Sequence, residues 1–137
     1  MPTLTRWFIK SGILCLVAVL TLSVAMQSPL LERVPFLRVV WPTYLHLLVV
    51  GWLTQLIFGV ALWLFPKHPG GKSRGSDGLG WVTFLLLTLG LLLRLIGEPR
   101  AAFVGRDAAG LLVASALAQL LAGWAFLINI WPRVRER

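Results

Sequence analysis

Charged residues and cysteines are scarce in this sequence. Only 13% of the 137 residues are charged, whereas roughly a quarter of the residues in a soluble domain are. Five acidic residues stand against 13 Lys and Arg, for a formal net charge of +8. Cys15 is the only cysteine and lies inside an apolar run, which excludes an internal disulfide framework and a cysteine-based metal site.

The basic excess does not predict nucleic-acid binding. Lys and Arg form short clusters between apolar runs, and no basic helix or alternation of basic and aromatic residues offers a surface for phosphates. Hydrophobic residues make up 58% of the chain, its mean hydropathy is +0.83, and it holds seven Trp. Because Trp concentrates at the two faces of a bilayer, we expect a single membrane domain, residues 1–137, surrounded by lipid.

Four apolar runs are long enough to cross a hydrocarbon core, which takes about 20 helical residues. The first also resembles a signal peptide, but the following "SVAMQSPLLERVP" lacks a clean cleavage pattern, so we expect a retained helix. Proline follows the other three runs and is expected to end each helix. The predicted fold is all-α, an integral membrane four-helix bundle, with spans at about residues 8–27, 42–65, 79–97 and 108–131.

With four crossings, both termini lie on one side of the membrane. The faces are distinguished by their basic residues, because cytoplasmic loops carry the excess of Lys and Arg. The face that holds the termini carries eight Lys and Arg and the other face carries five, which favours cytoplasmic termini in a bacterial or archaeal cell membrane. The first face carries Arg6, Lys10, Lys67, Lys72, Arg74, Arg133, Arg135 and Arg137, and the second carries Arg33, Arg38, Arg94, Arg100 and Arg106.

The loop "PKHPGGKSRGSDGLG" contains Gly-Lys-Ser, as phosphate-binding loops do. That motif needs a glycine five residues before its Gly-Lys pair and a preceding strand; here Pro66 stands at the glycine position and a membrane helix precedes it. We expect a flexible basic loop in which His68 is solvated.

Two spans carry small residues at every fourth position. Small residues let helix backbones approach closely, and a buried glutamine can hydrogen-bond across such a contact. We therefore interpret Gln55 and Gln119 as packing residues. The stripes are Gly51, Gln55 and Gly59 in the second span, and Gly110, Ala114, Ala118 and Ala122, flanked by Ser115, Gln119 and Gly123, in the fourth.

His46 stands apart from the glycine stripe of its own span. In a regular α-helix it points about 140° away from Gly51. A histidine above an aliphatic slot suits an axial haem ligand, since the ring nitrogen binds iron and the wall packs on the porphyrin. The alternative is a histidine that reaches toward the headgroups or bonds a neighbouring helix. The predicted slot consists of Val49, Val50, Leu53 and Ile57.

Arg94 and Glu98 lie at the outer end of the third span. Four residues apart on a helix, they are expected to pair. They form either an interfacial salt bridge or, with Arg94 directed at haem propionates, part of a cofactor site that includes His46. Arg100, in the adjoining "GEPR", is a second candidate for that contact.

The stretch "HLLVVGWLTQLIFGVALWLFP" resembles the second transmembrane helix of the catalytic subunit of haem–copper oxidases, most closely the nitric oxide reductase and cbb3-type branch. In that family a histidine near the outer end precedes a glycine-rich, aromatic stretch ending in Leu/Val-Pro. The resemblance covers residues 44–66. It implies that His46 is a low-spin haem b ligand and that Gly51, Gly59 and the terminal "WLFP" belong to the packing pattern.

The chain also departs from that family. The catalytic subunit has many more spans and several further histidines, which bind a second haem and copper, whereas no other histidine lies within a span here. The chain therefore cannot build a haem–copper centre or act alone as an oxidase. "TLGLLLRLIGEPR" and "INIWPRVR" are similar to parts of small four-helix proteins that resemble oxidase subunit I.

Two hypotheses follow. The first is a haem b protein of electron transfer or diatomic gas binding. In it, two copies each contribute His46, the haem is five-coordinate, or a partner subunit supplies the second ligand. The second is a scaffold or accessory subunit of a respiratory membrane complex, without haem and without catalysis. Whether His46 holds iron discriminates between them. The sequence lacks the paired intramembrane charges that a transporter needs and the catalytic residue sets that a hydrolase needs.

Overall fold

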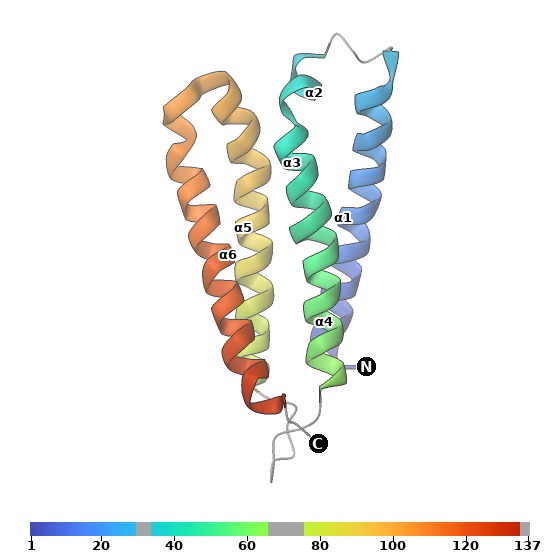
Figure 1. The fold of residues 1–137 in the computed structure, drawn as a ribbon, viewed down its shortest axis with the longest axis vertical. Helices are drawn as coiled ribbons and strands as arrows, with labels where there is room; N and C mark the ends of the chain where they lie inside the picture. The colour runs from blue at the N-terminus through green and yellow to red at the C-terminus, as the bar shows by residue number, and fades with distance from the viewer. Residues whose placement is uncertain (30–33, 66–75, 135–137) are drawn as a thin grey trace.

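The computed structural model describes residues 1–29, 34–65 and 76–134, and this part of the chain folds into helices without a strand (Figure 1). The loop that contains Gly-Lys-Ser and His68 lies outside the described residues. The long helices are α1 (Thr3–Gln27), α5 (Asp77–Val104) and α6 (Ala109–Ile130). The second span is composite: it comprises α3 (Trp41–His46), a π-helical segment (Leu47–Thr54) and α4 (Gln55–Leu64), and the short α2 (Pro35–Val39) precedes it.

Within the described residues, four helices are long and apolar enough to cross a membrane, as the sequence predicts. Two predicted boundaries are wrong. The first span begins at Thr3 rather than at residue 8, so Arg6 also lies within the helix. The third span continues through Pro99 to Val104. Proline removes one backbone donor, and near the end of a long, packed helix that loss does not stop the helix.

The bundle consists of two helical hairpins. In the first, α1 packs along the second span, and the glycine stripe predicted there forms the contact. A Cβ atom added to Gly59 would lie 2.6 Å from the Cβ of Phe8, and one added to Gly51 would lie 2.9 Å from the Sγ of Cys15. Gln55 is buried in this contact and accepts a hydrogen bond from the Ser11 hydroxyl of α1. The interpretation of Gln55 as a packing residue is confirmed.

The second hairpin pairs α5 with α6. The Ser115 hydroxyl donates to the backbone oxygen of Gly90 at 2.6 Å, and a Cβ at Gly90 would lie 2.8 Å from the Cγ of Gln119. The predicted stripe is half right: Ala118 and Ala122 are buried, but Gly110 and Ala114 are exposed. The contact follows alternating spacings of three and four, as in helices that cross at a small angle. Buried positions are Ser115, Ala118, Ala122, Ala125 and Asn129.

The start of α1 and the end of α6 lie at the same end of the bundle (Figure 1), and polar side chains fasten this end. Asn129 accepts from the Ser76 backbone N–H and donates to the Ser76 carbonyl, both at 3.0 Å. Arg133 is 1% exposed and donates from Nη2 to the carbonyls of Leu62 at 3.1 Å and Phe65 at 2.7 Å. We refer to Asn129, Arg133 and their backbone partners as the terminal clamp. It ties α6 to the end of α4 and the start of α5.

Candidate functional site

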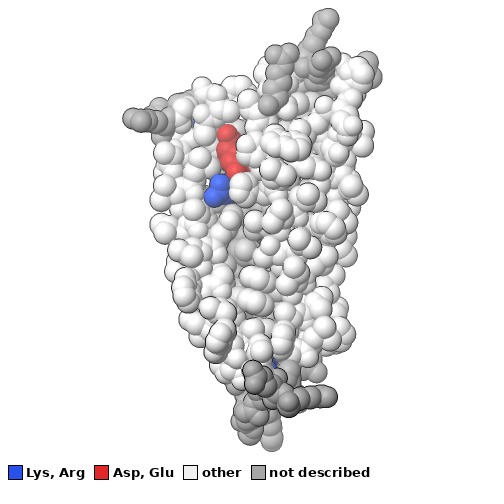
Figure 2. All heavy atoms as spheres, in the orientation of Figure 1, with Lys and Arg blue, Asp and Glu red and all other residues white. Residues whose placement is uncertain are grey.

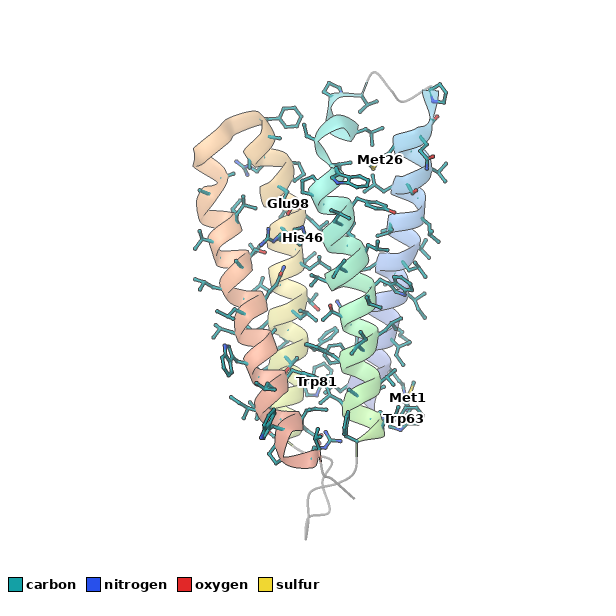
Figure 3. All side chains as sticks on the ribbon, viewed as in Figure 1. Met1, Met26, His46, Trp63, Trp81 and Glu98 are labelled. Atoms are coloured by element: carbon teal, nitrogen blue, oxygen red, sulfur yellow. The ribbon has the colours of Figure 1, made fainter. Side chains whose placement is uncertain are left out.

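At the opposite end of the bundle, a histidine and a glutamate meet across two helices. The Nδ1 atom of His46, the last residue of α3, lies 2.8 Å from Oε1 of Glu98 on α5. Figure 3 shows both labelled residues side by side between these helices. The Glu98 side chain is 7% exposed and that of His46 is 29% exposed. The sequence interpretation found nothing polar near His46 on its own helix face; the partner comes from a neighbouring helix instead.

The surroundings of Nδ1 define which ring nitrogen carries hydrogen. Nδ1 also lies 2.9 Å from the backbone oxygen of Pro42, one helical turn earlier. A carbonyl oxygen can only accept, so Nδ1 must be the donor, shared between Pro42 and Glu98. In the neutral ring, Nε2 then carries the lone pair. Within the described part of the chain, no hydrogen bond engages Nε2.

Arg94 completes this group, which we call the His46–Glu98–Arg94 cluster. Its Nη1 atom lies 3.4 Å from Oε1 of Glu98, so the pair predicted four residues apart on α5 is confirmed. Figure 2 shows one acidic and one basic group side by side on an otherwise uncharged stretch of the surface. An ion pair at this place, on a helix long enough to span a bilayer, is a candidate functional group.

The cluster is incompletely bonded. Three buried polar atoms in and beside it have no hydrogen-bond partner among the described residues: Oε2 of Glu98, Nε of Arg94 and the hydroxyl of Thr43, one turn before His46. Buried polar atoms are rarely left unpaired in folded proteins, and exceptions mark places where water, an ion or a ligand binds. The cluster therefore has hydrogen-bonding capacity that no described residue uses.

The aliphatic residues predicted to form a slot beside His46 do not share one face. Val49, Leu53 and Ile57 are 48%, 45% and 54% exposed on the outside of the bundle, whereas Val50 packs against the buried core. The prediction assumed a regular α-helix, but Leu47–Thr54 is π-helical. Each of its turns takes more residues than an α-helical turn, which changes the angle between side chains.

Arg100 does not join the cluster. It follows Arg94 by six residues, about 240° around a regular helix, and it is exposed. Of the predicted site residues, the structure therefore brings His46 and Arg94 together, linked by Glu98. The contact of Glu98 with His46 was missed, although its signal was present: a carboxyl group at the outer end of the third span, near the predicted depth of His46.

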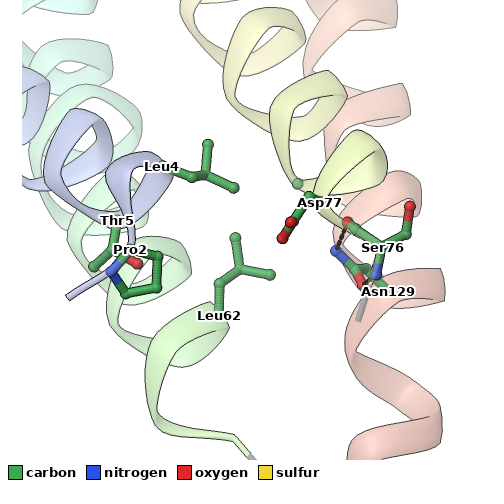
Figure 4. Close-up of a pocket in the computed structure, with 8 residues that line it drawn as sticks. Pro2, Leu4, Thr5, Leu62, Ser76, Asp77 and Asn129 are labelled. Carbon is green, nitrogen blue, oxygen red and sulfur yellow. Dashed lines mark hydrogen bonds between the residues drawn. The ribbon is translucent and has the colours of Figure 1, made fainter. Parts of the chain in front are cut away.

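A multi-ligand metal site is not formed by the described residues, since no group of three or more His, Cys, Asp or Glu lies close enough together. A small pocket lies at the other end of the bundle, against Thr5, Asp77 and Asn129 (Figure 4). Its volume of about 30 Å³ accommodates roughly one or two waters. The His46 side chain is 29% exposed, so a cofactor bound to it would lie at the outer surface of the bundle.

The site thus combines one imidazole with a directed lone pair, a carboxyl group that orients it and an adjacent guanidinium. This arrangement can bind a metal through one axial position and an anionic group beside it. Comparison of the chain with known protein families, with curated proteins and with solved structures gives no match.

Proposed function

We propose that this protein binds haem b through Nε2 of His46 and serves electron transfer or diatomic gas binding in a membrane. One observation carries the proposal: the Nδ1 hydrogen is directed at Pro42 and Glu98, which leaves Nε2 as the ligating nitrogen. Metal-binding histidines characteristically donate their second ring N–H to a carbonyl or carboxylate in this way. Haem supplies an iron that carries one electron or holds a gas at an axial position.

The residues around His46 fit such a group in composition. Exposed aliphatic side chains at Val49 and Leu53 lie along the same helix and offer an apolar surface to a porphyrin. Arg94, with its unpartnered Nε, offers a cation to a propionate. Arg100 lies on another side of α5 and is not part of this arrangement. Arg94 is therefore the residue that we propose for the contact with a propionate.

A homodimer accounts for the exposed position of His46. One histidine per chain supplies one axial ligand, and a twofold axis beside His46 would supply the second from the other copy. The haem would then lie between two bundles, shielded from lipid, at a ratio of one haem to two chains. In the proposed orientation the termini are cytoplasmic, in a bacterial or archaeal cell membrane, and His46 lies toward the outer face. The proposed electron partner is a respiratory complex of the same membrane.

The decisive measurement is a dithionite-reduced minus oxidised absorption spectrum of the protein, purified in detergent from cells that make ample haem. A sharp α-band is expected in the wild type and in His68→Ala, and it should be lost in His46→Ala. His68 is the matched control, because it is the only other histidine of the sequence. The haem-to-chain ratio and the response to carbon monoxide distinguish ligation by two histidines from an open sixth position.

His46→Ala could lose the α-band because the ligand is gone or because the chain misfolds, and His46→Gly distinguishes the two cases. Exogenous imidazole should restore the α-band to His46→Gly if the cavity left by the side chain is the ligand site. Absence of a band in wild-type protein, with the chain still folded by circular dichroism, would overturn the proposal. It would favour the alternative, an accessory or scaffold subunit that retains the helix for packing only.

A further inference from the structure

The second span contains eight consecutive π-helical residues, Leu47–Thr54, between two α-helical parts. π-Helical hydrogen bonds join residues five apart; in most proteins they occur only as single-turn bulges within α-helices, frequently at functional sites. Here the segment begins directly after His46 and ends directly before Gln55. The side chain of Thr54 supports it, because its hydroxyl donates to the carbonyl of Val49, five residues earlier, at 2.8 Å.

Such a segment changes the angular relationship between the two parts of the helix. A π-helical hydrogen bond joins residues five apart, whereas an α-helical bond joins residues four apart. The segment therefore contains about one residue more than an α-helix that connects the same two ends. If Leu47–Thr54 became α-helical, everything before it would turn by about 100° and shift by about 1.5 Å relative to everything after it.

Both parts are fixed by contacts with other helices. After the segment, Gln55 bonds Ser11 of α1, and Gly59 lies against Phe8 so closely that the helix cannot rotate there. Before the segment, His46 contacts Glu98 of α5. A rotation of about 100° would preserve only one of these two sets of contacts. An uninterrupted α-helix of this sequence therefore cannot make both.

We propose that the π-helical segment Leu47–Thr54 is a positioning element whose extra residue turns His46 onto Glu98 while the rest of the span stays packed on α1. The proposal goes beyond haem binding, because it concerns the placement of the imidazole whether or not iron is bound. Its direct consequence is unusual for a transmembrane helix: one residue can be deleted within the segment without loss of the contacts on either side.

The test deletes Val49, an exposed aliphatic residue within the segment. The matched control deletes Ile57, an exposed β-branched residue in α4, where the helix is regular. In a Cys15→Ala background, His46→Cys with Glu98→Cys reports the contact before the segment, and Ser11→Cys with Gln55→Cys reports the contact after it. Each pair is bridged by a short bifunctional thiol reagent.

Deletion of Val49 is expected to leave both cross-links forming as in the full-length chain and the melting temperature equal or higher. Deletion of Ile57 should move Gly59 away from Phe8 and lower the melting temperature by about 5 °C or more. The proposal is overturned if the Val49 deletion loses the His46–Glu98 cross-link, or if it melts as low as the Ile57 deletion. Neither readout requires haem, so this test fails or succeeds independently of the spectrum.

Discussion

The two ends of the bundle both bury charged or amide side chains, but they bond them differently. At the terminal clamp, Arg133 and Asn129 bond backbone groups that helix ends leave open, namely the carbonyls of Leu62 and Phe65 and both backbone groups of Ser76. At the other end, the members of the His46–Glu98–Arg94 cluster bond mainly one another, side chain to side chain.

This difference separates a structural role from a functional one. A side chain that satisfies backbone carbonyls at a helix end replaces water there and fastens one helix to another. A cluster that buries charge without completing its hydrogen bonds contributes little net stability, because desolvation offsets the attraction between its members. We therefore expect the terminal clamp to hold the fold and the cluster to bind a ligand.

The largest effect on stability is expected at Arg133. Arg133→Met keeps an unbranched apolar stem but removes the guanidinium group and its two charge-assisted hydrogen bonds to the end of α4. The expected loss is about 2–4 kcal/mol in the free energy of unfolding, measured by denaturant titration in detergent. Binding at His46 should persist in the fraction that stays folded. A change below about 0.5 kcal/mol would mean that the clamp does not stabilise this end.

A smaller effect is expected at the glycine contact beside the clamp. Gly59→Ala places a methyl group 2.6 Å from the Cβ of Phe8, and overpacking of this kind costs about 1–3 kcal/mol. Gly123→Ala is the matched control on α6, because nothing lies within 4 Å of the added atom. Alanine there should stabilise the helix by up to about 1 kcal/mol. Equal melting temperatures for the two variants would contradict the close contact of α1 and α4.

The sequence predicted the parts of this fold that depend on composition along the chain. Lipid requires about 20 apolar residues per helix, so the four runs identified the four spans. Spacing of glycines also predicted the contact at Gly51, Gln55 and Gly59, because close approach requires small residues. The boundary at Pro99 was wrong, since tertiary packing supports a helix that proline alone disfavours.

The candidate site was only partly predictable. His46 stood out as the one histidine within a span, and the Arg94–Glu98 pair followed from a spacing of four. The contact between them did not follow, because it depends on how two helices face one another. The π-helical segment could not be predicted either, because its residues are equally typical of an α-helix. It nevertheless changes the direction of His46 relative to Gly51. The angle between His46 and Gly51 expected for a regular α-helix was therefore wrong.

The smallest effect on stability, and the sharpest contrast with Arg133, is expected at Glu98. Glu98→Gln keeps the shape of the side chain and an oxygen that accepts from His46 and Arg94, while it removes a buried ionisable group. Because the amide still accepts from Arg94 and the Arg94 side chain stays 22% exposed to its surroundings, the free energy of unfolding should fall by only about 1 kcal/mol.

The same substitution should nevertheless alter the site. An amide oxygen accepts the Nδ1 hydrogen more weakly than a carboxylate, so His46 becomes a poorer electron donor to iron. The reduced-minus-oxidised α-band should persist while the midpoint potential rises, as redox titration would report. A loss of stability as large as that of Arg133→Met would instead make the cluster a second clamp. In that case, its unpartnered atoms would reflect packing between α3 and α5 rather than a ligand yet to be bound.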